Sequence, residues 1–331
     1  MCATKSQENS KYHFLVHFWP SKDGFHKRME LFLDVLQTKG HVEKIRTFKS
    51  FLKCLSTGCF HKKGTDVFFY TSLMAPVLIL LRLVGSRITV YYMVRGDEVT
   101  YVKHARRYFR AFVAFVFQKL MNFLNCHFIF ASEDLRVLFD QRLGGVRRAY
   151  VLPNTIGRTL PPIRQFDGRV ALVGDFGSVK NIEWAIESLS KGIFEVHLFG
   201  NKSMPDKWKR SWLHAHGVVT DLTAHLRSSC SLVVFPDTSS GFPNVLVEAL
   251  EADCCVVVHR NFPFRYLPIS DDWRFNLSAS NGRLPRAQSQ LEQVLSKLLC
   301  EQRDFKSDNL ELVKLIESDW EKRVWDIFDP K

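Results

Sequence analysis

The stretch that decides the fold of this chain is ALVGDFGSVKNIEWAIESL, residues 171–189. Apolar residues run up to Gly174, a turn with a second glycine follows, and a helical pattern starts near Asn181. A strand that turns through glycines into a helix is the opening unit of a parallel, doubly wound sheet. Glycines also let a ligand approach the backbone closely, and the N-terminus of a helix favours an anion.

Lys180 stands at the start of this expected helix, where its positive charge opposes the helix dipole. Two interpretations stay open: the ammonium neutralises a bound phosphate, or it is a solvated surface lysine. Gly200 ends the next apolar stretch, Phe194–Phe199, and is weak evidence for a ligand site when taken alone.

Short apolar strands alternate with helical patterns along the whole sequence. The expected strands are His13–Phe18, Val67–Thr71, Ile88–Val94, Phe128–Ala131, Tyr150–Leu152, Val170–Val173, Phe194–Phe199, Leu232–Phe235 and Cys255–Val258. This alternation predicts an α/β fold with parallel, doubly wound sheets.

The segment GRTLPPI, residues 157–163, contains a glycine and two prolines and has no periodicity, so we place a domain boundary there. The sequence then predicts one Rossmann-like domain in residues 1–160 and a second one from residue 165. Two such domains facing each other form a central cleft, and open sheets of this kind bind ligands at the carboxyl ends of their strands.

A second strand–turn–helix unit, FPDTSSGFPNVLVEAL, covers residues 235–250. Its N–H groups over Gly241–Val245 are placed to cradle a diphosphate. Glu248 lies one turn beyond Asn244 on the same helix face, where a carboxylate accepts hydrogen bonds from sugar or ribose hydroxyls. The alternative for Glu248 is an exposed helix residue without a role in binding.

Charge is distributed unevenly between the two halves. The 331 residues hold 46 Lys and Arg against 34 Asp and Glu, a net charge of +12. Residues 1–150 contain 24 basic and 11 acidic residues, whereas residues 151–331 contain 22 and 23. We expect the first half to face a polyanion or an acidic lipid, with a merely soluble basic surface as the alternative. No nucleic-acid reading motif is present, so that class is disfavoured.

The eight cysteines have no C-x-x-C spacing and follow a polar N-terminus, so we expect reduced thiols in a cytoplasm and no zinc site. The most apolar window, residues 67–85, is broken by Pro76 and Arg82, which argues against a membrane span. Residues 101–124 form an aromatic helical pattern with a cationic start. This helix either lies at a membrane surface or is a core helix with a basic end.

Several segments, in order, carry a family resemblance. In the second half they are Gly174, Lys180, Gly200, Gly217–Leu222, Pro236, Gly241, Phe242, Glu248 and Ala249. In the first half they are Gly24, Gly40–His41, Ala131–Glu133 and Leu152–Asn154, and near the end Asp319–Lys322 and Trp325. Over nearly its whole length the chain thus resembles the retaining glycosyltransferases of family 4 (GT4).

The resemblance implies the GT-B fold, with a nucleotide-sugar-binding domain in residues 165–315 and a helix in residues 316–331 that returns to the first domain. It implies transfer of a sugar from a nucleotide-sugar with retention and without a metal or other cofactor. The donor-binding residues it implies are Gly24, Gly174, Gly200, Ser240, Gly241, Phe242, Pro243, Asn244 and Val245.

In this interpretation the diphosphate leaves with its negative charge stabilised by Lys180, by the loop N–H groups and by Arg95, which follows the expected strand Ile88–Val94. Glu248 positions the ribose, and Asp97 or Glu98 contacts the acceptor. A structural pair between an arginine and a carboxylate is the alternative for Arg95 and Asp97.

The resemblance favours a UDP-sugar donor, with a GDP-sugar second, and a glycan or lipid-linked glycan acceptor of the lipopolysaccharide, O-antigen or capsule type. The expected location is the cytoplasm, with peripheral contact between the basic half and the inner face of the membrane. No nucleic-acid partner is expected.

Two positions depart from the family pattern: Asp175 replaces its arginine, and Ser240 replaces its first glutamate. These changes keep open a catalytically degenerate sugar-nucleotide-binding protein. An epimerase with the same fold is a third hypothesis, because a fold does not determine a function.

Overall fold

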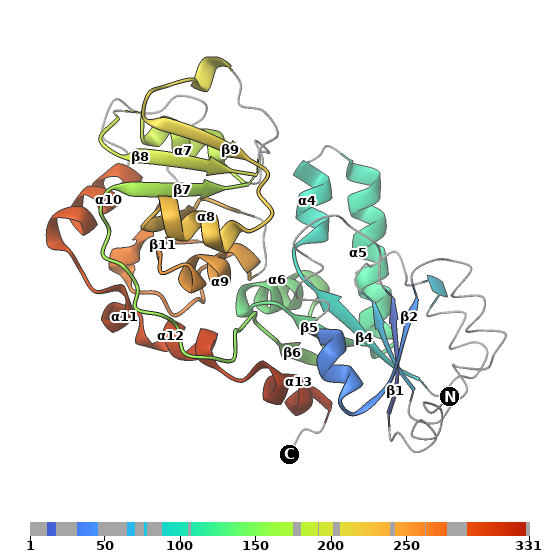
Figure 1. Ribbon diagram of the computed structural model, residues 1–331. Coiled ribbons are helices and arrows are strands. Elements are labelled where there is room, and N and C mark those ends of the chain that lie inside the picture. The colour runs from blue at the N-terminus through green and yellow to red at the C-terminus, as the bar shows by residue number, and fades with distance from the viewer. Residues whose placement is uncertain are drawn as a thin grey trace. The chain divides into compact units, whose positions relative to one another are not determined.

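The computed structural model describes residues 12–17, 32–45, 65–69, 76–77, 88–104, 107–174, 180–190, 192–200, 206–238, 242–261, 263–276 and 290–328. The chain divides into two compact units, Met1–Pro153 with Glu321–Lys331, and Asn154–Trp320. Each unit contains one six-stranded sheet (Figure 1). Every strand pairing among the described residues is parallel, which confirms the prediction of two Rossmann-like α/β domains.

The sheet of the first unit has the strand order β2-β1-β3-β4-β5-β6. The strands are β1 Tyr12–His17, β2 Gly40–Ile45, β3 Thr65–Phe69, β4 Thr89–Val94, β5 His127–Phe130 and β6 Ala149–Val151. The helices are a short one at residues 32–37, α4 Glu98–His104, α5 Tyr108–Phe123, α6 Glu133–Leu143 and, from the chain end, α13 Trp320–Phe328.

The last helix of the chain packs on the first sheet. Phe328 of α13 contacts the rings of Phe14, Phe68 and Tyr91 on three neighbouring strands, with centroid distances of 5.8, 5.8 and 5.3 Å. Aromatic rings bury large apolar areas, so this cluster ties the end of the chain to the core of the first unit.

The sheet of the second unit has the order β12-β11-β10-β7-β8-β9. Its strands are β7 Arg169–Val173, β8 Glu195–Phe199, β9 Leu213–Gly217, β10 Leu232–Phe235, β11 Cys255–His259 and β12 Arg274–Phe275. Its helices are α7 Ile182–Ser188, η3 Asp206–Trp208, α8 Leu222–Ser229, α9 Asn244–Glu251, η4 Asp271–Trp273, α10 Gln290–Glu301, α11 Phe305–Asp308 and α12 Leu310–Glu317.

Strands β10 and β11 are buried along their entire length, because a parallel sheet is covered on both faces. Their continuous apolar runs made them predictable. The edge strand β9 was missed: only Leu213 is buried in it, and three of its residues are exposed, so it has no apolar run.

The strand order reverses direction at β7. The chain moves from β7 to β8 and β9 on one side, then returns to β10 and β11 on the other side. With right-handed crossovers, α7 therefore lies on one face of the sheet and α8 and α9 lie on the opposite face. A ligand crevice in an open sheet forms where the order reverses, which here is the carboxyl end of β7 and β10.

Two glycines make a close backbone contact at this edge of the sheet. Gly174 follows β7 with φ +145° and Gly200 follows β8 with φ +98°. A Cβ atom on Gly200 would lie 3.3 Å from the backbone nitrogen of Gly174. The N–H of Gly174 donates to Phe199 at 2.9 Å, and that of Gly200 donates to Gly217 at 2.7 Å. Both N–H groups are thus used within the sheet.

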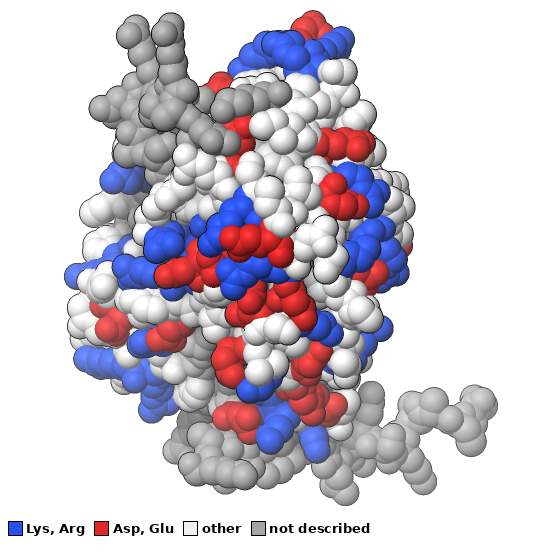
Figure 2. Space-filling model, turned by 90° about the vertical axis from the view of Figure 1, so that its left-hand side faces the viewer, with Lys and Arg blue, Asp and Glu red and all other residues white. Residues whose placement is uncertain are grey.

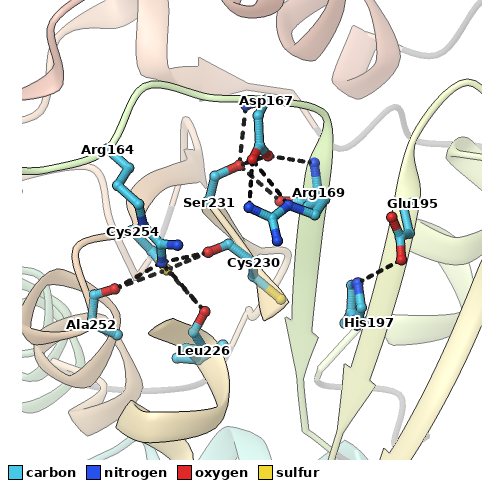
Figure 3. Close-up of polar contacts among 10 residues, drawn as sticks. All are labelled: Arg164, Asp167, Arg169, Glu195, His197, Leu226, Cys230, Ser231, Ala252 and Cys254. Atoms are coloured by element: carbon cyan, nitrogen blue, oxygen red, sulfur yellow. Dashed lines mark hydrogen bonds and ion pairs between the residues drawn. The ribbon is translucent and has the colours of Figure 1, made fainter. Parts of the chain in front are cut away.

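Arg164 holds the opposite end of the second unit (Figure 3). Its guanidinium donates to the carbonyl of Cys230, which follows α8, at 2.7 Å and to that of Ala252, which follows α9, at 3.1 Å. The backbone N–H of Arg164 also donates to the carbonyl of Asp253 at 2.8 Å. A cation at the C-termini of two helices satisfies their last carbonyls and complements their dipoles.

Cysteines around this arginine belong to the core. Cys230, Cys254 and Cys255 are buried and carry free thiols. Burial raises the pKa of the Cys254 thiol to about 11, so this thiol stays protonated at neutral pH. These residues behave as small buried side chains and hydrogen-bond donors.

Charges on the second unit are mixed. Figure 2 shows acidic and basic side chains interspersed over the face that lies on the left of Figure 1. Ion pairs of this unit include Lys297 with Asp272 at 2.8 Å and Arg303 with Asp308 at 2.8 Å. The near-neutral net charge of residues 151–331 thus includes oppositely charged side chains that pair locally. None of the helices in the described ranges has the length and apolar character that crossing a bilayer requires.

Replacing Arg164 with methionine is expected to lower the free energy of unfolding by about 2 kcal/mol, because charge-assisted hydrogen bonds to two helix ends are lost. The matched control is Arg158→Met: this side chain is 71% exposed and pairs with Glu251. An exposed pair contributes about 0–1 kcal/mol. Urea unfolding measures both variants, and equal losses would refute the role of Arg164.

Gly200→Ala is expected to destabilise the second unit more than Gly168→Ala. Both glycines have nearly the same φ, +98° and +94°, but a Cβ on Gly168 meets nothing within 4 Å. The difference in stability between the two variants therefore measures the cost of the contact with Gly174. Overpacking of this kind costs about 1–3 kcal/mol. Thermal unfolding of the two variants tests this, and the contact carries no weight if their midpoints agree.

Candidate functional site

The reversal edge of the second sheet holds a lysine and an aspartate from different strand–turn–helix units. Lys180 precedes α7, and Asp237 follows β10. The ammonium of Lys180 forms an ion pair with the carboxylate of Asp237. The Asp237 side chain is 6% exposed and that of Lys180 is 36% exposed. A buried carboxylate therefore pairs with a lysine whose side chain is partly exposed.

The stem of Lys180 lies over Gly174. The position of a Cβ on Gly174 is 3.5 Å from the Cγ and Cδ atoms of Lys180. A side chain at this glycine would touch the lysine stem, and its φ of +145° is one that L-residues rarely adopt. The glycine at the end of β7 thus gives the lysine room to reach Asp237.

The backbone of Asp237 is fixed by a buried histidine. Nε2 of His259, at the end of β11, lies 2.5 Å from the carbonyl oxygen of Asp237. The N–H of Asn261 donates to Nδ1 of His259 at 3.2 Å, so the neutral ring carries its proton on Nε2 and donates it to Asp237. Burial lowers the pKa of His259, which keeps the ring neutral.

Asn181 joins the start of α7 to the loop after β10. Its side-chain amide donates to the carbonyl of Pro236 at 2.8 Å. The residue has φ +50°, a left-handed conformation that asparagine tolerates better than most residues. Asn181 and Pro236 therefore form a second link, next to the Lys180–Asp237 ion pair, between the start of α7 and the loop after β10.

The N-terminus of α9 is anchored by Asn154. The amide of Asn154 donates to the carbonyl of Phe242 at 2.8 Å and to Oδ1 of Asn244 at 2.8 Å. Phe242 is buried. Pro243 has no N–H and supplies no donor to a ligand, so among the described residues of this turn the backbone donors are Phe242, Asn244 and Val245.

Glu248 lies in the second turn of α9 and is half-buried. It belongs to the same helix as Asn244 and Val245, as the sequence predicted. Its role in holding a ribose stays a prediction.

Arg95 and Asp97 belong to the first unit, at the end of β4. Both oxygens of Asp97 accept hydrogen bonds from the guanidinium of Arg142 on α6, each at 2.6 Å. The N–H of Thr100 also donates to Asp97 at 3.3 Å, and Asp97 is 2% exposed. Asp97 thus has the geometry of a structural carboxylate, with Arg142 rather than Arg95 as its bidentate partner. Glu98 accepts a hydrogen bond from the hydroxyl of Tyr92 at 3.3 Å.

Four positions of interest lie outside the described residues: Gly24, Asp175, Ser240 and Gly241. The structure brings Gly174, Lys180 and Gly200 together, and the turn from Phe242 to Val245 lies at the same edge of the sheet, after β10. Their roles in binding a donor stay predictions.

Four residues of this region were not predicted as site residues from the sequence: Asp237, His259, Asn154 and Asn181. A signal for Asp237 was available: it is a carboxylate directly after a buried strand at the end where the sheet binds ligands. The histidine and the two asparagines act through contacts between distant segments, so local patterns did not reveal them. Within the described ranges, no group of three or more His, Cys, Asp or Glu is arranged to hold a metal ion.

Comparison with known proteins places a family match on this same region. Residues 167–266 match the family model described as "Glycosyl transferases group 1". The match covers β7 through β11, which includes Lys180, Asp237 and α9. No curated protein matches the sequence of the chain.

Solved structures resemble the chain over both units. Sucrose-phosphate synthase from Thermosynechococcus elongatus has 13% identity and a TM-score of 0.69, with 96% of this chain and 98% of that chain covered. Trehalose 6-phosphate synthase from Burkholderia multivorans has 10% identity and a TM-score of 0.62, covering 97% and 96%. A TarM variant from S. aureus, in complex with fondaparinux, alpha-GlcNAc-glycerol and UDP, has 13% identity and a TM-score of 0.52.

The chain spans 53% of the length of that TarM chain, although 82% of its own residues are covered. Identities this low establish the fold alone. Two parallel six-stranded sheets and these neighbours together show that the chain has the GT-B fold, and residues 167–266 of its second unit match the glycosyl transferases group 1 model.

Proposed function

We propose that this protein is a glycosyltransferase that moves a sugar from a nucleoside-diphosphate donor to a glycan or lipid-linked glycan acceptor. The observation that carries the proposal is Lys180 at the reversal edge of the second sheet, inside the segment that matches glycosyl transferases group 1. A lysine with a partly exposed side chain at the start of a helix is suited to a diphosphate.

The chemistry follows from charge. Negative charge develops on the diphosphate as the glycosidic bond breaks, and preorganised donors stabilise it. Lys180 supplies a cation, and the N–H groups of Asn244 and Val245 at the start of α9 supply dipoles. Glu248 holds the ribose hydroxyls from the same helix.

The finer assignments belong to the same proposal. The donor is a UDP-sugar in preference to a GDP-sugar; the TarM complex holds UDP, and the pneumococcal O-GlcNAc transferase GtfA, at 11% identity, is in complex with UDP and GlcNAc. Transfer is of a hexosyl group with retention and without a metal. The acceptor is of the lipopolysaccharide, O-antigen or capsule type. The enzyme works in the cytoplasm, at the inner face of the membrane.

A second candidate function is favoured by the Lys180–Asp237 ion pair. Asp237 neutralises the lysine, and the sequence adds Asp175 and Ser240 where the family has arginine and glutamate. A protein that binds a sugar nucleotide without transferring the sugar fits this balance of charges. Hydrolysis or transfer of a radiolabelled UDP-sugar in the presence of acceptor separates the two functions.

Lys180→Ala is expected to weaken UDP binding about 10- to 100-fold, because one charge-assisted contact of about 1.5–3 kcal/mol is lost. Isothermal titration with and without EDTA measures this, and EDTA is expected to leave the affinity unchanged. The control is Lys209→Ala, whose side chain is 68% exposed and pairs with Asp206 on the 3-10 helix η3. If Lys180→Ala bound UDP with the affinity of wild type, the donor site would not lie at this edge of the sheet.

Asp237→Asn is expected to act in the opposite direction and to raise the affinity for UDP about tenfold, or about 1.4 kcal/mol. The reason is electrostatic: a buried carboxylate repels the diphosphate and competes with it for Lys180. The double variant with Lys180→Ala should lose most of the gain. A weaker affinity in Asp237→Asn would instead make Asp237 a positioning residue for the lysine.

A further inference from the structure

Helix α5 exposes an unusual share of large apolar side chains. Its exposed residues of this kind, with their exposed fractions, are Tyr108 63%, Phe109 78%, Phe112 62%, Val116 40% and Phe123 70%. A soluble surface carries scattered apolar residues, but a contiguous group of aromatic rings on one helix marks an interaction surface.

These side chains share one face of the helix. Phe109, Phe112, Val116 and Phe123 follow one another at intervals of three, four and seven residues, which is the spacing of a single helical stripe. The buried residues of α5 are Ala111, Ala114, Gln118 and Met121. The fully buried residues of the helix thus include no aromatic side chain, whereas Phe109, Phe112 and Phe123 are exposed.

Exposed cations lie on the same helix as this aromatic stripe and just before it. Arg107, Arg110 and Lys119 are exposed, and Lys103 is exposed on α4 nearby in sequence. The ammonium of Lys119 lies 5.3 Å from the ring centroid of Phe115. None of the 16 residues of α5 is acidic. The helix is therefore positively charged, which favours contact with an anionic surface over a cationic one.

We propose that the exposed face of α5 docks on an anionic lipid membrane, with its aromatic rings among the headgroups and upper acyl chains. Aromatic residues prefer this interface, and each nearby Lys or Arg adds attraction to anionic lipids. The inference deepens the proposed function, since it rests on an acceptor carried by a lipid. The proposed aromatic surface consists of residues of α5 only.

Two other occupants fit the observations less well. A second copy packed on the same face would bring Arg107, Arg110 and Lys119 of both chains together without a carboxylate on α5 to pair with them. A nucleic acid would use the cations, but it would leave the aliphatic Val116 and the far Phe123 at the end of the helix without a role. A membrane uses both the rings and the charges.

The first test is flotation of the full chain with vesicles of phosphatidylcholine alone or mixed with phosphatidylglycerol. The wild type is expected to float with the anionic vesicles. The double variant Phe109→Ser, Phe112→Ser is expected to lose about tenfold or more in partitioning, because its apolar contact is removed. The control pair is Ile193→Ser, Val218→Ser, at residues 57% and 68% exposed in the second unit, which should float like the wild type.

A charge variant separates the two contributions. Arg107→Glu with Arg110→Glu is expected to abolish the preference for phosphatidylglycerol, whereas Arg210→Glu with Arg265→Glu makes the same change of charge on exposed residues of the second unit and should keep it. Higher salt should weaken binding to the anionic vesicles in the wild type.

Contact with the acyl chains has its own readout. Phe112→Trp is expected to show additional fluorescence quenching by bromine-labelled acyl chains, relative to wild type, and Val218→Trp is expected to show none. The proposal is overturned if wild type does not float, if the aromatic variant floats like wild type, or if α5 instead mediates dimers or binding to single-stranded RNA in the absence of vesicles.

The same variants keep this inference separate from the donor site. Phe109→Ser, Phe112→Ser should bind UDP with the affinity of wild type. If the wild type does not bind UDP, the donor site is refuted and the flotation result still stands. If the wild type binds UDP but does not float, only the membrane surface is refuted.

Discussion

The parallel pairing of β7 with β8 on one side and β10 on the other is the constraint on which the second unit depends. Parallel strands end at the same edge, so residues 57 positions apart in the chain, Lys180 and Asp237, meet there. Gly174 at that edge leaves room for the stem of Lys180, and Gly200 lets the backbone of Gly174 come close. The pairing of Lys180 with Asp237 is thus a consequence of the strand order, which a local sequence pattern does not reveal.

The helices of this unit are held at both ends. Arg164 satisfies the carbonyls after α8 and α9 at one end, and Asn154 holds the turn before α9 at the other. Because α9 carries Asn244, Val245 and Glu248, its position determines where the N–H dipoles of its first turn and the carboxylate of Glu248 lie. The first unit contributes a different kind of surface, in which an aromatic stripe and cations lie on one helix, α5.

The fold could be predicted because its signals are local and repeated. Buried strands such as β10 and β11 are continuous apolar runs, and glycines mark the turns that follow β7 and β8. The strand β9 escaped because an exposed edge strand needs no apolar run. Asp97 was predicted as an acceptor contact with a structural pair as alternative, and its bidentate partner, Arg142, lies 45 residues away on α6. Such a partner has no local signature.

The amino-acid sequence alone determined the class of fold, the alternation of buried strands with helices, the strand ends at which polar and glycine residues gather, and the basic character of the first half. Periodicity, turn chemistry and charge are properties of neighbouring residues. The partners of those residues were decided only by the tertiary structure. Burial of Asp237 against Lys180, the neutral His259 that holds its backbone, and the outward turn of the aromatic residues of α5 depend on which segments pack together. Tertiary packing brings residues that are far apart in the sequence into contact, and local sequence patterns do not reveal such contacts.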